Sequence, residues 1–129
     1  MNAWEEQGVE IAAPYRRQIK VLFAPDKEGV EEITFSHAIL PPGGRTDYHV
    51  HDRPELIYIV SGSGICVHEG KETMVREDVA LWVPKGEHHQ MINTGDVPLK
   101  LATVFVPAYT ASQNYKRCQD AAEAAATKK

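Results

Sequence analysis

Closely spaced glycine and proline turns are the feature that most constrains the fold of this chain. Between residues 24 and 96, turn signals such as Pro41-Pro42-Gly43-Gly44 and Ser61-Gly62-Ser63-Gly64 recur at short intervals. The apolar and β-branched runs between them are too short for ordinary helices, and several alternate with a period of two. These runs are residues 33–40, 56–60, 65–68, 79–83 and 99–106. The pattern predicts an all-β sandwich or barrel.

The length of the chain limits it to one domain. With 129 residues and 14.4 kDa, residues 1–129 are expected to form a single domain around its own core. We expect a β-barrel core over residues 30–107 and an N-terminal arm over residues 1–29. The apolar residues of the first twenty positions suggest that this arm covers part of the barrel.

The C-terminal tail has a different composition from the rest of the chain. Residues 110–129 are rich in alanine and are predicted to form a short helix. Tyr115, Cys118, Ala122 and Ala125 would form one thin apolar stripe on it. The alternative is a frayed tail exposed to solvent.

Charge and composition narrow the classes of partner. The formal net charge is −4, which disfavours nucleic acid, and no apolar run approaches the ~20 residues that span a bilayer. The first residues are acidic and do not resemble a secretory signal. Two cysteines, Cys66 and Cys118, are too few for a disulfide framework. We therefore expect a cytoplasmic protein with reduced thiols and with neither a nucleic-acid nor a membrane partner.

The chemistry of the chain is concentrated in a histidine motif followed by a glutamate. On a strand, His49 and His51 point to the same side, and Pro54 lets the chain turn before Glu55. A further imidazole comes from His88 or His89. Since neighbours on a strand face opposite ways, only one of that pair is expected at the site. Three imidazoles and one carboxylate suit a divalent transition metal.

These residues resemble the cupins. The first cupin motif, G-x5-H-x-H-x3-E-x6-G, is matched by Gly43, His49, His51, Glu55 and Gly62. The second, G-x5-P-x-G-x2-H-x3-N, is matched by Pro84, Gly86, His89 and Asn93, but its opening glycine falls on Asp78. With the flanking strands, the likeness covers about residues 30–107.

The resemblance implies a single jelly-roll barrel, of the small single-domain type, that binds one metal ion through His49, His51, Glu55 and His89. Fe, Mn, Ni, Co, Cu and Zn are all compatible with such ligands. It also implies a small-molecule ligand or substrate and a homodimer.

Strand parity predicts which residues surround the metal. Arg45 and Asp47 share parity with His49, Ile57 and Ile59 share it with Glu55, and Met91 shares it with His89. Asp47 is a candidate general base. His37 is a candidate for the pocket wall, although a lone histidine on an apolar strand is more often structural. A solvated loop end is the alternative for Arg45 and Asp47.

Two classes of function fit this set. The first is a metal-dependent enzyme that acts on a small oxygen-rich organic molecule, as a dioxygenase or as a metal-assisted lyase, isomerase or cyclase. The second is a non-catalytic module that binds or senses a small ligand. The fold does not choose between them. The complete ligand set, with two positions open on a six-coordinate ion, favours an enzyme.

Overall fold

The computed structural model describes residues 1–127, and these form two antiparallel sheets and one long helix. A 3-10 turn at Ala3–Glu5 precedes nine strands. The strands are β1 (Val9–Ile11), β2 (Arg17–Phe23), β3 (Thr34–Leu40), β4 (Glu55–Ser61), β5 (Ser63–His68), β6 (Lys71–Arg76), β7 (Ala80–Val83), β8 (His89–Ile92) and β9 (Leu99–Phe105). The helix is α1 (Ala111–Thr127). Lys128 and Lys129, the end of the predicted helical tail, lie outside the described residues.

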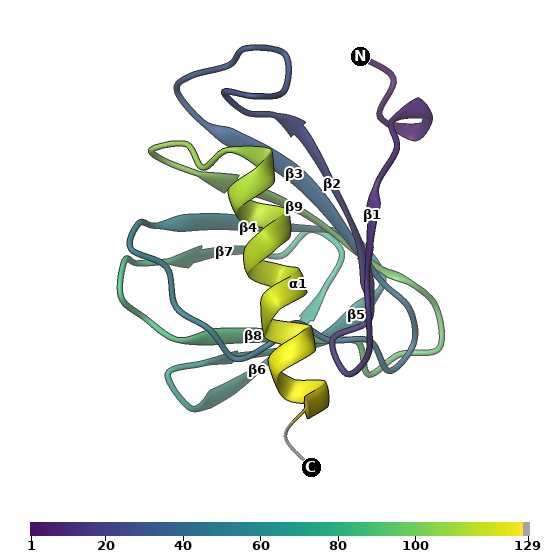
Figure 1. Cartoon of the computed structure of the whole chain (residues 1–129). Coiled ribbons are helices and arrows are strands. Elements are labelled where there is room, and N and C mark those ends of the chain that lie inside the picture. Colours follow the sequence, from purple (N-terminus) through teal and green to yellow (C-terminus); the bar gives the residue numbers. More distant parts are fainter. Residues whose placement is uncertain (128–129) are drawn as a thin grey trace.

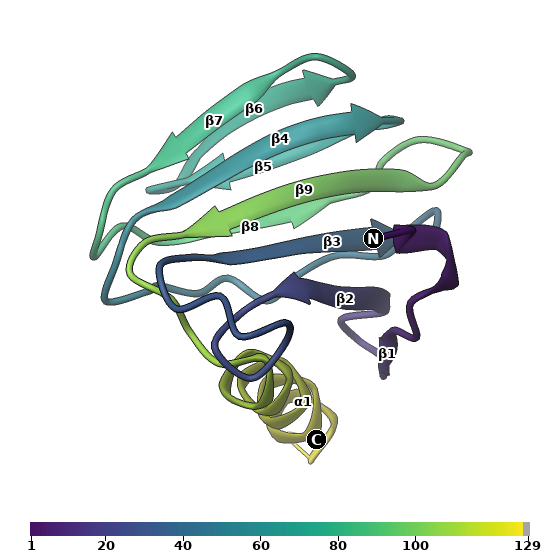
Figure 2. The ribbon, with the colours of Figure 1, turned by 90° about the horizontal axis from the view of Figure 1, so that it is seen from above.

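The two sheets face each other as in a jelly roll (Figures 1 and 2). The larger sheet has the strand order β1-β2-β3-β9-β4-β7, and the smaller one β6-β5-β8. Partners far apart in sequence, such as β3 with β9 and β4 with β9, are antiparallel. The prediction of an all-β jelly-roll barrel with a short C-terminal helix is confirmed.

The core lies between the sheets. Inward-facing residues alternate with outward-facing ones along β4, β8 and β9, as the period of two predicts. Burial of this apolar surface is the main source of the barrel's stability. The buried core residues are Leu40, Ile57, Ile59, Cys66, Val75, Val83, Met91, Leu99 and Leu101.

The segment expected to be an N-terminal arm contributes two strands to the larger sheet. β2 pairs with β3, and β1 pairs with β2 along the outer edge. Ile11 and Ile19 are buried there against α1, whereas Trp4 is 78% exposed. The limits of the barrel core at residues 30–107 and of the arm at residues 1–29 remain predictions.

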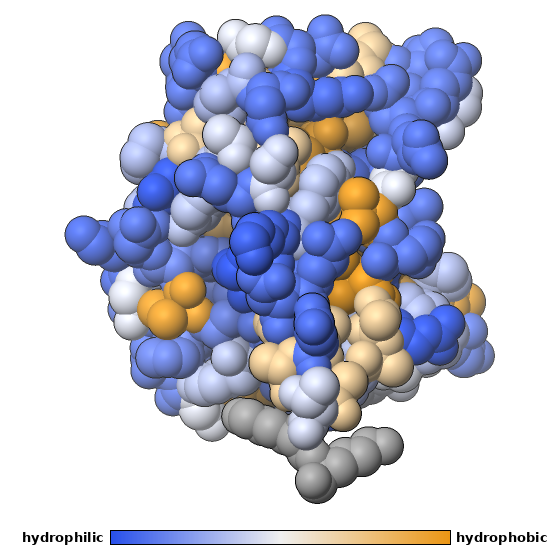
Figure 3. Space-filling view, in the orientation of Figure 1, coloured by the Kyte–Doolittle hydropathy of each residue, from blue (hydrophilic) through white to orange (hydrophobic). Residues whose placement is uncertain are grey.

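The helix packs on the barrel through the predicted stripe. Cys118 and Ala122 are buried against Ile11 and Ile19, and Tyr115 packs at their edge. The Tyr115 hydroxyl accepts a hydrogen bond of 2.8 Å from the backbone N–H of Val21. The face that carries α1 is mostly hydrophilic, and hydrophobic residues show beside the helix towards β1 (Figure 3). The alternative of a frayed tail therefore does not hold for this part of the chain.

The start of α1 is held by a carboxylate from another part of the chain. The Asp26 side chain accepts hydrogen bonds from the backbone N–H groups of Ala111 and Ser112, at 2.6 and 3.1 Å. Such bonds satisfy donors that have no partner within a helix. Within residues 1–127, no helix is both long and apolar enough to cross a membrane.

The one departure from the second motif has a local explanation. Asp78, at the position of the expected glycine, has a φ of +69°. Aspartate enters this left-handed region more readily than most residues, so the turn keeps its shape without glycine.

Candidate metal centre

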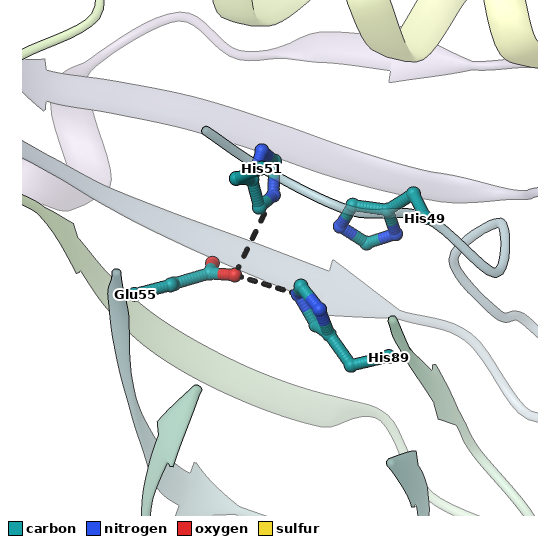
Figure 4. Close-up of side chains that lie close together, drawn as sticks. All are labelled: His49, His51, Glu55 and His89. Atoms are coloured by element: carbon teal, nitrogen blue, oxygen red, sulfur yellow. Dashed lines mark hydrogen bonds and ion pairs between the residues drawn. The ribbon is translucent and has the colours of Figure 1, made fainter. Parts of the chain in front are cut away.

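Four side chains converge inside the barrel, at the end where α1 lies (Figure 4). His49 and His51 come from the loop before β4, Glu55 begins β4, and His89 begins β8. An isolated bridge between His49 and His89, with both N–H···O bonds near 3 Å, holds the loop against β8. Of the two neighbouring histidines, His89 is buried in the cluster and His88 is exposed, which is the arrangement that the prediction of His89 as a ligand requires.

The four ligand atoms lie close enough together to share one ion. Each residue offers one ligand atom, and all four atoms lie within 4.8 Å of one another. Metal–ligand bonds of about 2.0–2.2 Å place donors on opposite sides of an ion about 4 Å apart. The cluster therefore needs to contract by less than about 1 Å to bind a transition metal ion.

The hydrogen bonds of the rings present their Nε2 atoms to this centre. His49 Nδ1 lies 2.7 Å from the carbonyl oxygen of Asp47, and donation to it leaves His49 Nε2 as the acceptor. His89 Nδ1 lies 3.3 Å from the carbonyl of Glu87, while its Nε2 is 2.8 Å from Glu55 Oε1. His51 Nε2 lies 3.6 Å from the same oxygen. The donor set of three imidazoles and one carboxylate fits a divalent ion such as Fe, Mn, Ni, Co, Cu or Zn.

The environment keeps two of the histidines neutral. Burial, followed by the positive charge of Arg117 and the nearby ring of His89, lowers the pKa of His51 to about 3. Burial, and then Arg117, holds the pKa of His49 well below its usual value. Neutral imidazole is the form that binds a metal, so these two ligands are prepared for it at physiological pH.

The cluster lines a small cavity together with polar and apolar side chains. Its volume is about 60 Å³. Ile57, Met91 and Leu101 are among the apolar residues of its lining, and Asn114 and Arg117 of α1 are among the polar ones. A second cavity of about 150 Å³ adjoins it, and both are lined by His51, Asn114 and Arg117.

The predicted pocket residues divide into two groups. Ile57, Met91 and His37 line the cavity. Ile59 is fully buried but belongs to the core, since along β4 it lies about 13 Å beyond Glu55. Arg45 is exposed and does not line the cavity. Strand parity with His49 predicts Arg45 in the pocket. Residues 41–54, however, make only isolated bridges, and the alternation breaks where Thr46 and Asp47 are both buried.

Asp47 is buried beside the cluster and bound by two arginines. Its carboxylate accepts hydrogen bonds from Arg117 at 2.9 and 3.3 Å, and it lies 3.8 Å from Arg17. Burial alone would raise the pKa of Asp47, but the bonds from Arg117 and the nearby His49 lower it overall. The carboxylate is therefore an ion-pair partner, and its backbone carbonyl orients His49.

Sequence reasoning missed Arg17, Asn114 and Arg117 as residues of the site. A signal was present for two of them, because Asn114 and Arg117 stand one turn apart next to the buried position Cys118. No local pattern connects Arg17, on β2, with the histidine motif.

The loop between the ligands is tied to the segment that leads into α1. Arg53 donates hydrogen bonds to the carbonyls of Pro107 and Ala108, and its guanidinium stacks 3.7 Å from the centre of the Tyr109 ring. The Tyr109 hydroxyl donates to Asp52 at 2.7 Å. The ligand loop and the segment just before α1 are therefore linked by direct contacts.

Comparisons with known proteins agree with the fold and with the motifs. The family model described as a cupin domain matches residues 36–106, more than half of the chain. The chain belongs to the cupin family.

Two curated relatives show the range of similar proteins. The chain is 29% identical over 99 residues to the tetracenomycin polyketide synthase protein TcmJ of Streptomyces glaucescens, covering 74% of this chain and 66% of that protein. It is 30% identical over 73 residues to an oxalate-binding protein of Thermotoga maritima, covering 56% and 60%. The chain thus spans somewhat less than two thirds of these relatives.

A solved structure shares the fold over most of both chains. It is a protein of Thermotoga maritima described as a predicted oxalate decarboxylase, with a TM-score of 0.75 and 22% identity. The match covers 82% of this chain and 96% of that one.

Proposed function

We propose that this cupin is a metal-dependent enzyme that acts on a small oxygen-rich organic molecule. The observation that carries the proposal is the complete set of ligands, His49, His51, Glu55 and His89, on the wall of a small cavity. A divalent ion held by them would polarise a bound oxygen or acidify a bound water. Dioxygenation and a metal-assisted lyase, isomerase or cyclase step are the reaction classes in question.

The protein's own residues supply orientation and exclude water. The carbonyls of Asp47 and Glu87 fix the rings of His49 and His89, which is the role of outer groups at metal sites. Asp47 was a candidate general base, and its two arginine partners support a positioning role instead. We propose Ile57, Met91 and His37 as further walls of the substrate pocket.

A binding module without catalysis is the second candidate. The observation that favours it is the small cavity, about 60 Å³, together with the engagement of Asp47 in ion pairs. The name of the oxalate-binding relative supports the same alternative.

A turnover experiment separates the two candidates. Protein purified without a tag or chelator is expected to contain about one equivalent of transition metal per chain, measured by elemental analysis. The loaded protein is then incubated with a panel of small carboxylic and keto acids, and NMR and an oxygen electrode follow their consumption, with metal-stripped protein as the control. Consumption that depends on the metal supports the enzyme. Ligand binding without consumption would contradict the enzyme and favour the module. Absence of metal after reconstitution would likewise contradict the metal-dependent enzyme and favour the module.

We also propose that the chain forms a homodimer through the outer face of the larger sheet. Leu56 and Tyr58 of β4 and Trp82 of β7 lie there with 40%, 41% and 59% exposure, and Leu56 pairs directly with Trp82. Exposed apolar side chains that gather on one face are typical of an interface.

Light scattering tests the dimer. The wild-type protein is expected at twice the chain mass of 14.4 kDa. Trp82→Glu would place a charge in the interface and shift the protein to the single-chain mass. Met74→Glu, at an 86% exposed position on the other sheet, is the matched control. A monomeric wild type would refute the proposal.

A cytoplasmic location, with the two cysteines as reduced thiols, remains a prediction. In the structure Cys66 and Cys118 are both free and buried.

A further inference from the structure

Arg117, a residue of the cavity lining, carries a hydrogen-bond donor without an acceptor. Its two terminal nitrogens bind Asp47, whereas its Nε is buried and unpaired. Among residues 1–127 it is the one buried side-chain nitrogen or oxygen in this condition. Buried donors are almost always paired, so an orphan beside a cavity points to an acceptor that comes from outside the chain.

Asn114 presents a second polar group to the same space. It is buried on α1, one turn before Arg117, and both residues line the cavity of about 60 Å³ at the metal cluster and the adjoining one of about 150 Å³. In the described part of the chain its side-chain amide makes no hydrogen bond to protein. A ligand that extends from one cavity into the other therefore meets both side chains.

The charges on this side of the cavity do not balance. Arg17 and Arg117 share a single carboxylate, that of Asp47, so one positive charge is in excess. A low-dielectric site with excess positive charge next to a metal centre favours an anion.

Shape narrows the anion to a carboxylate. The cavity at the metal cluster is small, and its lining includes the apolar side chains of Ile57, Met91 and Leu101. A planar carboxylate matches the planar guanidinium of Arg117 and the amide of Asn114, and a second oxygen-bearing group of a short ligand would reach the metal.

We propose that Asn114 and Arg117 form a carboxylate-binding wall of the metal cavity, so that the ligand of this cupin is a small organic carboxylate held between the metal and α1. This inference rests on the proposed metal site and adds the class of its ligand. Arg117 acts as an anchor for the ligand and takes no part in binding the metal.

Titration calorimetry of the Co²⁺-loaded protein with oxalate tests the wall. Arg117→Gln is expected to weaken oxalate binding by about tenfold or more, because a charge-assisted hydrogen bond is lost. Arg117→Lys keeps the positive charge but loses the planar guanidinium with its paired N–H donors, so it is expected to recover part of the affinity for oxalate. Lys116→Gln is the matched control, since it removes the same charge from an exposed neighbour whose side chain is 75% exposed.

Metal affinity distinguishes an anchor from a merely structural residue. Loss of a positive charge beside the histidines is expected to leave Co²⁺ binding by Arg117→Gln as tight as in the wild type or tighter. An undocked helix would weaken metal and oxalate binding together and lower the melting temperature, and that result would overturn the proposal. Asn114→Ala provides a second variant that leaves the ion pairs intact, with an expected loss of about threefold to tenfold in oxalate affinity.

The remaining outcomes are equally decisive. If the wild type binds no metal, the proposed function fails. If it binds Co²⁺ but oxalate only strips the ion, or if Arg117→Gln and Asn114→Ala bind oxalate like the wild type, the carboxylate wall alone is refuted. Inorganic phosphate that binds as tightly as oxalate, and with the same dependence on Arg117, would overturn the assignment to carboxylates.

Discussion

Replacement of Glu55 by glutamine is expected to reduce the affinity for a divalent transition metal by at least about 100-fold while the barrel stays folded. Glutamine keeps the size of the side chain but removes the negative donor, which lies 2.8 Å from His89 Nε2 and 3.6 Å from His51 Nε2. Loss of an outer partner of a metal ligand typically costs 10- to 100-fold in affinity, so loss of a ligand itself costs at least about the upper value. His89→Ala is expected to have an effect of the same order.

The measurement is metal content after dialysis against a competing chelator, with circular dichroism for the fold. His88→Ala is the matched control, because it removes an imidazole from the exposed neighbour of His89. Full metal retention by Glu55→Gln and His89→Ala would show that the ion binds elsewhere or not at all.

Replacement of Gly62 by alanine is expected to destabilise the protein by about 3–5 kcal/mol. Gly62 has a φ of +87°, which L side chains rarely adopt. A Cβ there would also lie 2.4 Å from the carbonyl oxygen of Pro98 and 2.9 Å from the Leu99 Cα, both backbone atoms that cannot move alone. Strain and steric overlap therefore add at this turn between β4 and β5.

Gly70→Ala separates the two causes. Gly70 has a similar φ of +78°, but a Cβ there meets nothing within 4 Å. Its expected cost is the backbone strain alone, about 1–2 kcal/mol. Denaturant unfolding of both variants gives the comparison, and equal losses in stability would mean that the contact with Pro98 is relieved by movement of the loop.

The metal ligands could be predicted from the sequence because their geometry is set locally. The spacing of His49, His51 and Glu55 places three donors within a few residues of one another, and a single strand pairing brings in His89. The strands between the glycine and proline turns were predictable for the same reason, since period-two burial is a local pattern.

The residues that close the cavity were less predictable, since tertiary contacts position them. Arg17 reaches the site only because β2 joins the larger sheet. Asn114 and Arg117 reach it because α1 docks, and the apolar stripe predicted that docking but not its consequence for the cavity. Arg45 was misplaced because the alternation of a strand was extended into a loop.

The division of the site between two kinds of element has a consequence for how such a protein can change. The metal ligands belong to the barrel and to the loop that leads into β4, whereas Asn114 and Arg117 belong to a terminal helix held by Asp26, by apolar contacts and by the ion pair of Arg117 with Asp47. New side chains at those two helical positions would alter which molecule is accepted while the metal ligands stay in place, provided that a new residue at position 117 still pairs with the buried Asp47 carboxylate. The residues that select the ligand therefore lie on a different element from the residues that bind the metal. The C-terminal helix can be redesigned or replaced while the metal ligands are kept.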